Sequence, residues 1–140
     1  MLCNMIVQVV IDHMLEMVGL QSVFSKVYTN PSSFDESGCL HLFPYHRQDW
    51  CSMSSVNLCK GHVLDEHCRT SHITYDVIAY VGDGRNDFCP TLRLRETDVV
   101  FPRRKFVLEK YIAKDRDKVA ARVVPWDTGF DIINALKDVL

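Results

Sequence analysis

Hydrophobic positions in the first 43 residues predict one helix followed by two strands. Four apolar residues recur at helical spacing: Val10, Met14, Met17 and Val18. This spacing predicts a helix over residues 9–18 that ends at Gly19. Apolar runs over 23–29 and 40–43 predict two strands, because turn-forming residues lie between them. We expect these two strands to pair as a hairpin.

The rest of the chain alternates between strand and helix patterns. Residues 75–81 form a nearly continuous apolar run, which is typical of a strand buried on both faces of a parallel sheet. The other predicted segments are a loop over 44–55, a helix over 57–68, a helix over 88–94, a strand over 98–101, a helix over 106–114, a strand over 121–124 and a last helix to residue 140, capped by Asp127 or Thr128. This alternation predicts a single α/β domain over residues 1–140 with parallel strands.

Composition narrows the classes of partner. The chain has 140 residues, of which 47% are hydrophobic and 24% charged, and its net charge is -2. Because the chain carries no overall positive field, we expect neither nucleic acid nor an anionic membrane surface as a partner. No apolar run reaches the length of about 18 residues that a membrane-spanning helix needs.

The cysteines are expected to be reduced thiols of a cytoplasmic protein. Their positions are Cys3, Cys39, Cys51, Cys59, Cys68 and Cys89. No Cys-x-x-Cys motif occurs, and a chain of this length can bury a core without disulfide bridges. The apolar first 11 residues precede any Lys or Arg, since the first basic residue is Lys26, and we therefore expect no signal peptide.

Candidate chemistry is concentrated in the turn that follows the apolar run over 75–81. The sequence there is Gly82-Asp-Gly-Arg-Asn-Asp87, and ligands of parallel sheets bind at such carboxyl ends of strands. Two glycines allow a tight turn, while Asp83 and Asp87 supply hard oxygen ligands that suit Mg²⁺. The alternative is an ordinary solvated turn, which the buried strand before it and the helix after it disfavour.

The residues around this turn resemble a known enzyme superfamily. The segment over 80–90, YVGDGRNDFCP, closely resembles the fourth motif of the haloacid-dehalogenase phosphatases. Segments over 57–60, 98–104 and 123–127 are similar to those of the phosphoethanolamine/phosphocholine phosphatase family, which includes pyridoxal-phosphate phosphatases. The resemblance covers residues 9–140 and implies a Rossmann-like three-layer core.

The resemblance also implies a mechanism and roles for individual residues. The family hydrolyses small phosphorylated metabolites with Mg²⁺ through an aspartyl-phosphate intermediate. By position in the motif, Asp83 is a metal ligand, Asp87 supports the water shell of the metal, and Asn86 orders the phosphate site. Lys60 matches the lysine of the third motif, whose ammonium offsets charge on the phosphoryl group. Arg85 adds positive charge beside the site and is expected to influence substrate choice.

Two family motifs have no counterpart in the sequence. The first, Asp-x-Asp-x-Thr or Val after an apolar strand, supplies the nucleophile, and the second supplies a Ser or Thr that should lie near Asn4. The single Asp-x-Asp, Asp115-Arg-Asp117, is followed by Lys-Val and is interpreted as a solvated loop. We therefore expect a partial haloacid-dehalogenase core that lacks its first strands and cap.

This expectation has consequences for activity and assembly. Without the nucleophile the chain alone should be nearly inactive, since loss of a covalent nucleophile forfeits many orders of magnitude in rate. The alternative is a non-catalytic binding or regulatory paralogue that keeps a weak Mg²⁺ or phosphate site. Loss of the first strands would leave the strand over 75–81 at an exposed edge, which predicts self-association.

Two further groups of residues admit a functional and an ordinary interpretation. Cys51, Cys59, His62, His67 and Cys68 could form a zinc site, but their spacing matches no standard zinc pattern, and the family usually has a cysteine and a proline where Ser54 and Ser55 stand. The spacing disfavours zinc. The basic run over 103–105 could steer a phosphorylated substrate, although such short runs are usually solvated edges.

Overall fold

The structure is a computed structural model, and it describes residues 1–138. Its elements are β1 (Leu2–Val7), α1 (Gln8–Met17), β2 (Val27–Asn30), β3 (Ser32–Phe34), β4 (Leu40–Leu42), α2 (Lys60–Thr70), β5 (Ala79–Gly82), α3 (Phe88–Thr91), β6 (Val99–Pro102), α4 (Val107–Lys114), β7 (Arg122–Val123) and α5 (Gly129–Lys137). Among these helices none has the length and apolar character needed to cross a bilayer.

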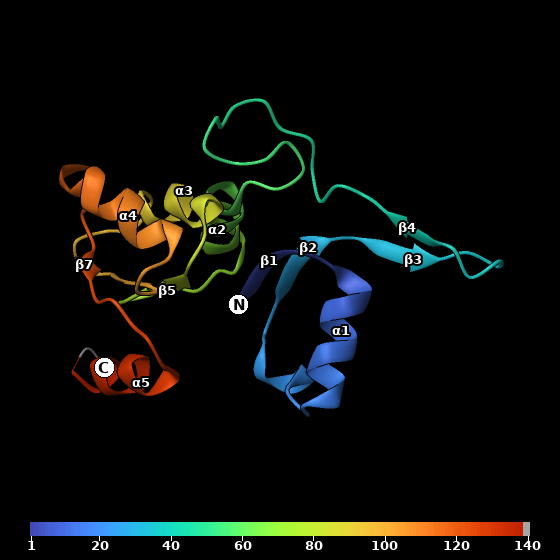
Figure 1. Cartoon of the computed structure of the whole chain (residues 1–140), viewed down its shortest axis with the longest axis horizontal. Helices are drawn as coiled ribbons and strands as arrows, with labels where there is room; N and C mark the ends of the chain where they lie inside the picture. The colour runs from blue at the N-terminus through green and yellow to red at the C-terminus, as the bar shows by residue number, and fades with distance from the viewer. Residues whose placement is uncertain (139–140) are drawn as a thin grey trace.

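The second half of the chain confirms the predicted parallel α/β arrangement. Strands β5, β6 and β7 form a parallel sheet in that order, with Ala79 opposite Val99 and Val99 opposite Arg122. Helices α2, α3 and α4 lie on one side of this sheet and α5 on the other (Figure 1). The helix α5 begins with the predicted cap, since Thr128 and Asp131 form a capping box.

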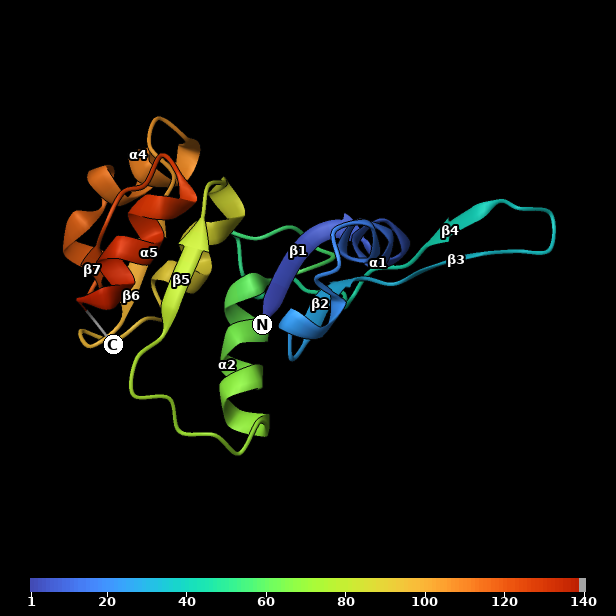
Figure 2. The same ribbon diagram turned by 90° about the horizontal axis from the view of Figure 1, so that it is seen from below.

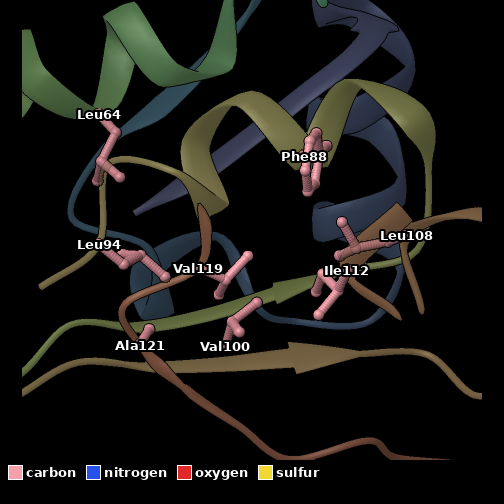
Figure 3. Close-up of a cluster of buried hydrophobic side chains, with 8 residues drawn as sticks. All are labelled: Leu64, Phe88, Leu94, Val100, Leu108, Ile112, Val119 and Ala121. Carbon is pink, nitrogen blue, oxygen red and sulfur yellow. The ribbon is translucent and has the colours of Figure 1, made fainter. Parts of the chain in front are cut away.

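The main hydrophobic core lies between the sheet and the helices on one of its sides. Val100 of β6 packs there against residues from α2, α3 and α4 and from the segments that precede β6 and β7 (Figure 3). The fully assembled cluster is Leu64, Phe88, Leu94, Val100, Leu108, Ile112, Val119 and Ala121. Because this core joins α2 to the turn after β5, it fixes the relative position of Lys60 and the Gly82–Asp87 segment.

The first half of the chain departs from the sequence prediction. Strand β1, which the sequence analysis did not predict, pairs in parallel with β2, while α1 packs beside them. The hairpin is formed by β3 and β4, with Ser32 opposite Leu42, and it projects from the body (Figure 1). The predicted pairing of 23–29 with 40–43 is therefore wrong.

The hairpin has a local cause. The Asp35 carboxylate accepts hydrogen bonds from the backbone N–H groups of Ser37 and Cys39, which closes the loop directly after β3. Gly38 adopts a positive φ of 80°, which glycine allows without strain. The turn thus brings Ser32–Phe34 opposite Leu40–Leu42 to form the hairpin. Strand β2 therefore remains free to pair with β1.

The prediction of a long strand buried on both faces is also wrong. Only Ala79–Gly82 forms β5, and its residues Ala79 and Val81 are exposed. In the described chain β5 pairs with β6 alone and is therefore an edge strand (Figure 2). The Arg95 guanidinium donates to the carbonyl oxygens of Tyr75 and Asp76, so these residues are bound by a side chain instead of a strand ladder.

Candidate active site

Lys60 begins α2 and reaches the turn that follows β5. Its Nζ donates to Oδ1 of Asp87 at 2.7 Å, although the two residues are 27 positions apart in the sequence. The side chains are 10% and 4% exposed, so the ion pair is buried. The structure therefore brings together the lysine and one carboxylate that the sequence analysis singled out.

Both oxygens of the Asp87 carboxylate are occupied by hydrogen bonds. Oδ1 also accepts the Tyr80 hydroxyl at 2.8 Å, and Oδ2 accepts the backbone N–H groups of Asp83 at 3.1 Å and Gly84 at 2.9 Å. Burial by itself raises the pKa of Asp87, but the Lys60 ammonium and these hydrogen bonds outweigh it, and the pKa is lowered. Asp87 is therefore an ionised anchor for the turn.

Two glycines allow the turn to close on Asp87. A Cβ atom at Gly82 would lie 2.8 Å from both Cβ and Cγ of Asp87, and one at Gly84 would lie 2.8 Å from Oδ1 of Asn86. These separations are too short for carbon and oxygen atoms in contact. Glycine at position 82 is thus needed here for close approach to Asp87, whereas a Cβ at position 84 would displace only the end of the Asn86 side chain.

Asp83 has a fixed backbone and a free carboxylate. Its N–H donates to Asp87, and its carbonyl oxygen accepts the N–H of Leu108, in the first turn of α4, at 2.9 Å. Its side chain is exposed and has no hydrogen-bond or ion-pair partner among residues 1–138. A single well-positioned carboxylate beside solvent fits Mg²⁺, which binds through one or two carboxylates and keeps several waters.

Asn86 and Arg85 differ in their surroundings. The Asn86 amide donates to Sδ of Met5, on β1, at 2.8 Å and links the turn to the first sheet. Arg85 is exposed, and its guanidinium has no partner in the described part of the chain. It is therefore the available positive charge beside Asp83.

Tyr80 belongs to this site and was not predicted. Its hydroxyl donates to Asp87, and burial together with the Asp87 carboxylate raises the pKa of Tyr80 well above its usual value. The signal was present in the sequence, because Tyr80 lies two residues before Gly82. Alternate residues of a strand point to the same face of the sheet, so Tyr80 lies on the same face as Gly82. From there its hydroxyl reaches Asp87 of the turn.

Other candidate residues do not join the site. Asp115 pairs with Lys118 at 2.5 Å in the short helical turn Arg116–Lys118. The Arg103 guanidinium lies 4.5 Å from the ring centroid of Phe106, and Arg104 pairs with Asp127 at 3.2 Å. These basic side chains are engaged in packing and ion pairing at the end of β6.

The candidate zinc ligands are separated by the fold. His67 shares hydrogen bonds with Tyr28 and Tyr75, each at 3.0 Å, and His62 packs against Trp50. Cys51 and Cys59 do approach each other, but their third neighbour is Cys89, which sequence spacing did not indicate. The five residues therefore do not form one zinc site, as their spacing already indicated, although Cys51 and Cys59 do cluster.

Comparison with known proteins identifies the family. A family model described as "Putative Phosphatase" matches residues 4–140. The chain belongs to this family. The matched residues include Lys60, Asp83 and Asp87, and the relatives described below are named as phosphatases.

Curated relatives of this putative phosphatase carry three different substrate names. A "Thiamine phosphate phosphatase-like protein" from Arabidopsis thaliana is 41% identical, with 86% of this chain and 52% of the relative covered. A "Pyridoxal phosphate phosphatase" from Mus musculus is 38% identical over 91% of this chain and 55% of the relative. A "Phosphoethanolamine/phosphocholine phosphatase" from Gallus gallus is 34% identical over 93% and 51%.

These matches cover most of this chain but only part of each relative. The chain spans about half the length of the curated relatives it matches. No solved structure matches it significantly.

Proposed function

We propose that the chain provides the lysine and metal-binding part of a Mg²⁺-dependent phosphomonoester phosphatase site that acts on small phosphorylated metabolites. The observation that carries this proposal is the buried ion pair between Lys60 and Asp87. Asp87 also accepts the backbone N–H of Asp83, whose exposed carboxylate has no partner among residues 1–138. The names of the relatives add phosphoethanolamine, phosphocholine and pyridoxal phosphate as candidate substrates.

Each residue has a distinct role in this proposal. Asp83 would bind Mg²⁺, and Asp87 holds the backbone N–H of Asp83 and thereby orients its carboxylate. Mg²⁺, when bound, would offset charge on the phosphoryl oxygens. Lys60 donates one of its three N–H bonds to Asp87, and another can contact a phosphoryl oxygen. Arg85 would attract the dianionic substrate.

The chain alone should catalyse hydrolysis slowly or not at all. Both oxygens of Asp87 are occupied, and Asp83 is assigned to the metal, so neither is available as a nucleophile. Among the described residues no further aspartate pairs with Lys60. Charge stabilisation without a nucleophile retains only a small part of a phosphatase's rate.

The test is Mg²⁺ binding and phosphate release by the purified chain. We expect calorimetry to detect Mg²⁺ binding that Asp83→Asn abolishes and that Asp117→Asn, a change of an exposed carboxylate, leaves intact. Absence of Mg²⁺ binding by a chain that circular dichroism shows to be folded would refute the proposed site. Phosphate release from phosphoethanolamine that Asp83→Asn abolishes would instead refute the expected inactivity.

The occupied Asp87 carboxylate also favours a second function, a non-catalytic regulator that keeps the Mg²⁺ or phosphate site. Addition of the chain to a full-length phosphatase relative separates the two possibilities. A regulator should change the relative's rate in proportion to the added chain, and Asp83→Asn should remove the effect. An unchanged rate at saturating chain would exclude this second function.

A further inference from the structure

Three cysteines from separate segments converge beside the ion pair. Sγ of Cys89 lies 3.5 Å from Sγ of Cys51 and 3.7 Å from Sγ of Cys59. Cys51 belongs to the loop before α2, Cys59 directly precedes α2, and Cys89 lies in α3. All three residues are buried, and their sulfur atoms lie within 4.8 Å of one another.

A fourth polar atom completes this cluster. Oγ of Ser54 lies 3.5 Å from Sγ of Cys51 and 3.3 Å from Sγ of Cys59. A tetrahedral Zn²⁺ with Zn–S bonds of about 2.3 Å and a Zn–O bond of about 2.0 Å places its sulfurs about 3.8 Å apart and its oxygen about 3.5 Å from each sulfur. Four of the six separations between these atoms are close to these values: 3.5 and 3.7 Å from Sγ of Cys89 to the other two sulfurs, and 3.5 and 3.3 Å from Oγ of Ser54 to Cys51 and Cys59.

The loop that presents these donors is held in shape from within. The buried Gln48 side chain donates to the carbonyl oxygens of Cys51 at 3.1 Å and Ser55 at 2.9 Å, and it accepts the N–H of Cys51 at 2.8 Å. The Gln48 side chain therefore provides backbone hydrogen bonds that a helix or strand would otherwise supply in this loop. Such preorganisation favours ligand binding, because less conformational entropy is lost when the ligand binds.

We propose that Cys51, Cys59, Cys89 and Ser54 bind one structural zinc ion. On binding, each thiol releases a proton to solvent, so one Zn²⁺ exchanges for three protons, and the Ser54 hydroxyl coordinates as a neutral ligand. All four positions of the metal are then filled by the protein, which is typical of a structural site and leaves no place for a substrate. The proposal is independent of the Mg²⁺ site at Asp83.

A zinc ion at this position would connect the segments that carry the buried ion pair. Cys59 directly precedes Lys60, and Cys89 follows Asp87 by two residues. Zinc would therefore tie together the two segments that carry the ion pair. Because the thiols are buried, the metal would enter as the loop folds onto α2 and α3, and zinc binding would stabilise the folded chain.

The test is the metal content of the full 140-residue chain, purified with a reductant and then supplied with Zn²⁺. We expect one zinc per chain by elemental analysis and, after exchange with Co²⁺, thiolate-to-cobalt charge-transfer absorption. Cys51→Ser and Cys89→Ser should weaken binding by more than about 100-fold, since loss of an outer-shell partner alone costs up to that factor. Cys68→Ser, which changes a half-buried thiol outside this cluster, should leave binding unchanged.

Two outcomes would overturn the proposal. These are a folded, reduced chain that takes up no zinc, and equal zinc binding by wild type and Cys89→Ser. If Cys89→Ser fails to fold, the decision rests on the wild type and on Ser54→Ala. A chelator should lower the melting temperature of the wild type, and Ser54→Ala should bind zinc more weakly while still folding.

Discussion

The two partners of the buried ion pair are not equivalent. In Asp87→Asn the new amide group would point at the N–H groups of Asp83 and Gly84, or else lose its contacts with Lys60 and Tyr80. Lys60 would remain as a buried charge without a counterion, which costs about 3–5 kcal/mol. In Lys60→Met, by contrast, Asp87 keeps its hydrogen bonds from the Tyr80 hydroxyl and from the N–H groups of Asp83 and Gly84.

We therefore expect Asp87→Asn to lower the free energy of unfolding more than Lys60→Met. Urea denaturation followed by circular dichroism measures both changes. Equal losses, or a larger loss in Lys60→Met, would mean that the ion pair accounts for the loss of stability and that the other hydrogen bonds of Asp87 contribute little. Lys118→Met, which removes an exposed ion pair with Asp115, should change stability by less than about 1 kcal/mol.

Asp98 should make the stability of the chain depend on pH. Burial raises its pKa, but the Arg95 guanidinium and the N–H groups of Arg95 and Ile78 outweigh this effect, and the pKa is lowered. Because the folded pKa is below the unfolded value of about 4, the stabilisation is complete above that value and is lost as the pH falls below it.

The expected result is a free energy of unfolding that decreases as the pH is lowered below about 4. Asp98→Asn should lower stability at neutral pH and reduce this slope, since its amide does not titrate. Asp117→Asn, at an exposed position, is the control and should keep the wild-type slope. Urea denaturation at several pH values measures the slope, and identical slopes in all three chains would contradict the assignment.

At the scale of elements, glycines determine how closely the helices and the turn approach. A Cβ at Gly61 of α2 would lie 2.5 Å from Sγ of Cys89, and one at Gly82 would lie 2.8 Å from Asp87. We expect Gly61→Ala and Gly82→Ala to cost about 1–3 kcal/mol each, as overpacked positions do. Gly129→Ala, at the start of α5 with nothing within 4 Å, should be neutral or stabilising. Thermal melting of the three variants provides the comparison.

The sequence predicted the elements whose causes are local. The helix over 9–18, the cap at Thr128 and the turn at Asp35 follow from spacing and side-chain chemistry within a few residues. Strand β1 was missed because its sequence, LCNMIV, lacks clear alternation and is stabilised by pairing with β2. The predicted burial of the strand over 75–81 on both faces was wrong because face burial depends on which elements pack over the sheet, whereas its edge position agrees with the expectation drawn from the missing motifs.

The same distinction applies to the candidate site. Lys60, Asp83 and Asp87 were found through motifs that resemble a known family, and the structure pairs Lys60 with Asp87. Cys89 was missed because its contact with Cys59 joins residues 30 positions apart and depends on the packing of α3 against α2. Sequence spacing identifies metal sites whose ligands are close in the chain, whereas the cysteines of this cluster come from segments far apart in the chain.

For the whole molecule, burial is unevenly distributed. Within residues 1–138 every fully buried hydrophobic residue except Ile11 follows residue 50. The helical stripe of α1 is exposed instead of packed, with Met14 at 56% and Met17 at 73% exposure. Exposed apolar surface on this scale favours contact with another protein surface.

The edges of the two parallel sheets determine where that contact should form. In the described chain β5 pairs with β6 alone and β1 with β2 alone, and a cavity of about 490 Å³ lined by residues of β1, α2 and β5 lies between them. Unpaired strand edges beside an apolar cavity are templates for pairing with a second chain. We expect a second copy of this chain to be the partner, with β5 at the contact.

Light scattering coupled to size-exclusion chromatography should therefore show a molar mass that rises with concentration. Val81→Lys places a charge on the exposed face of β5 and should shift the chain toward the monomer, whereas Ile133→Lys, on the exposed surface of α5, should not. A monomer at every concentration, with one cooperative melting transition, would show that the exposed edge is compatible with a stable isolated chain. Pairing through β5 predicts that only Val81→Lys shifts the chain toward the monomer. Equal effects of Val81→Lys and Ile133→Lys would instead indicate nonspecific association through exposed apolar residues.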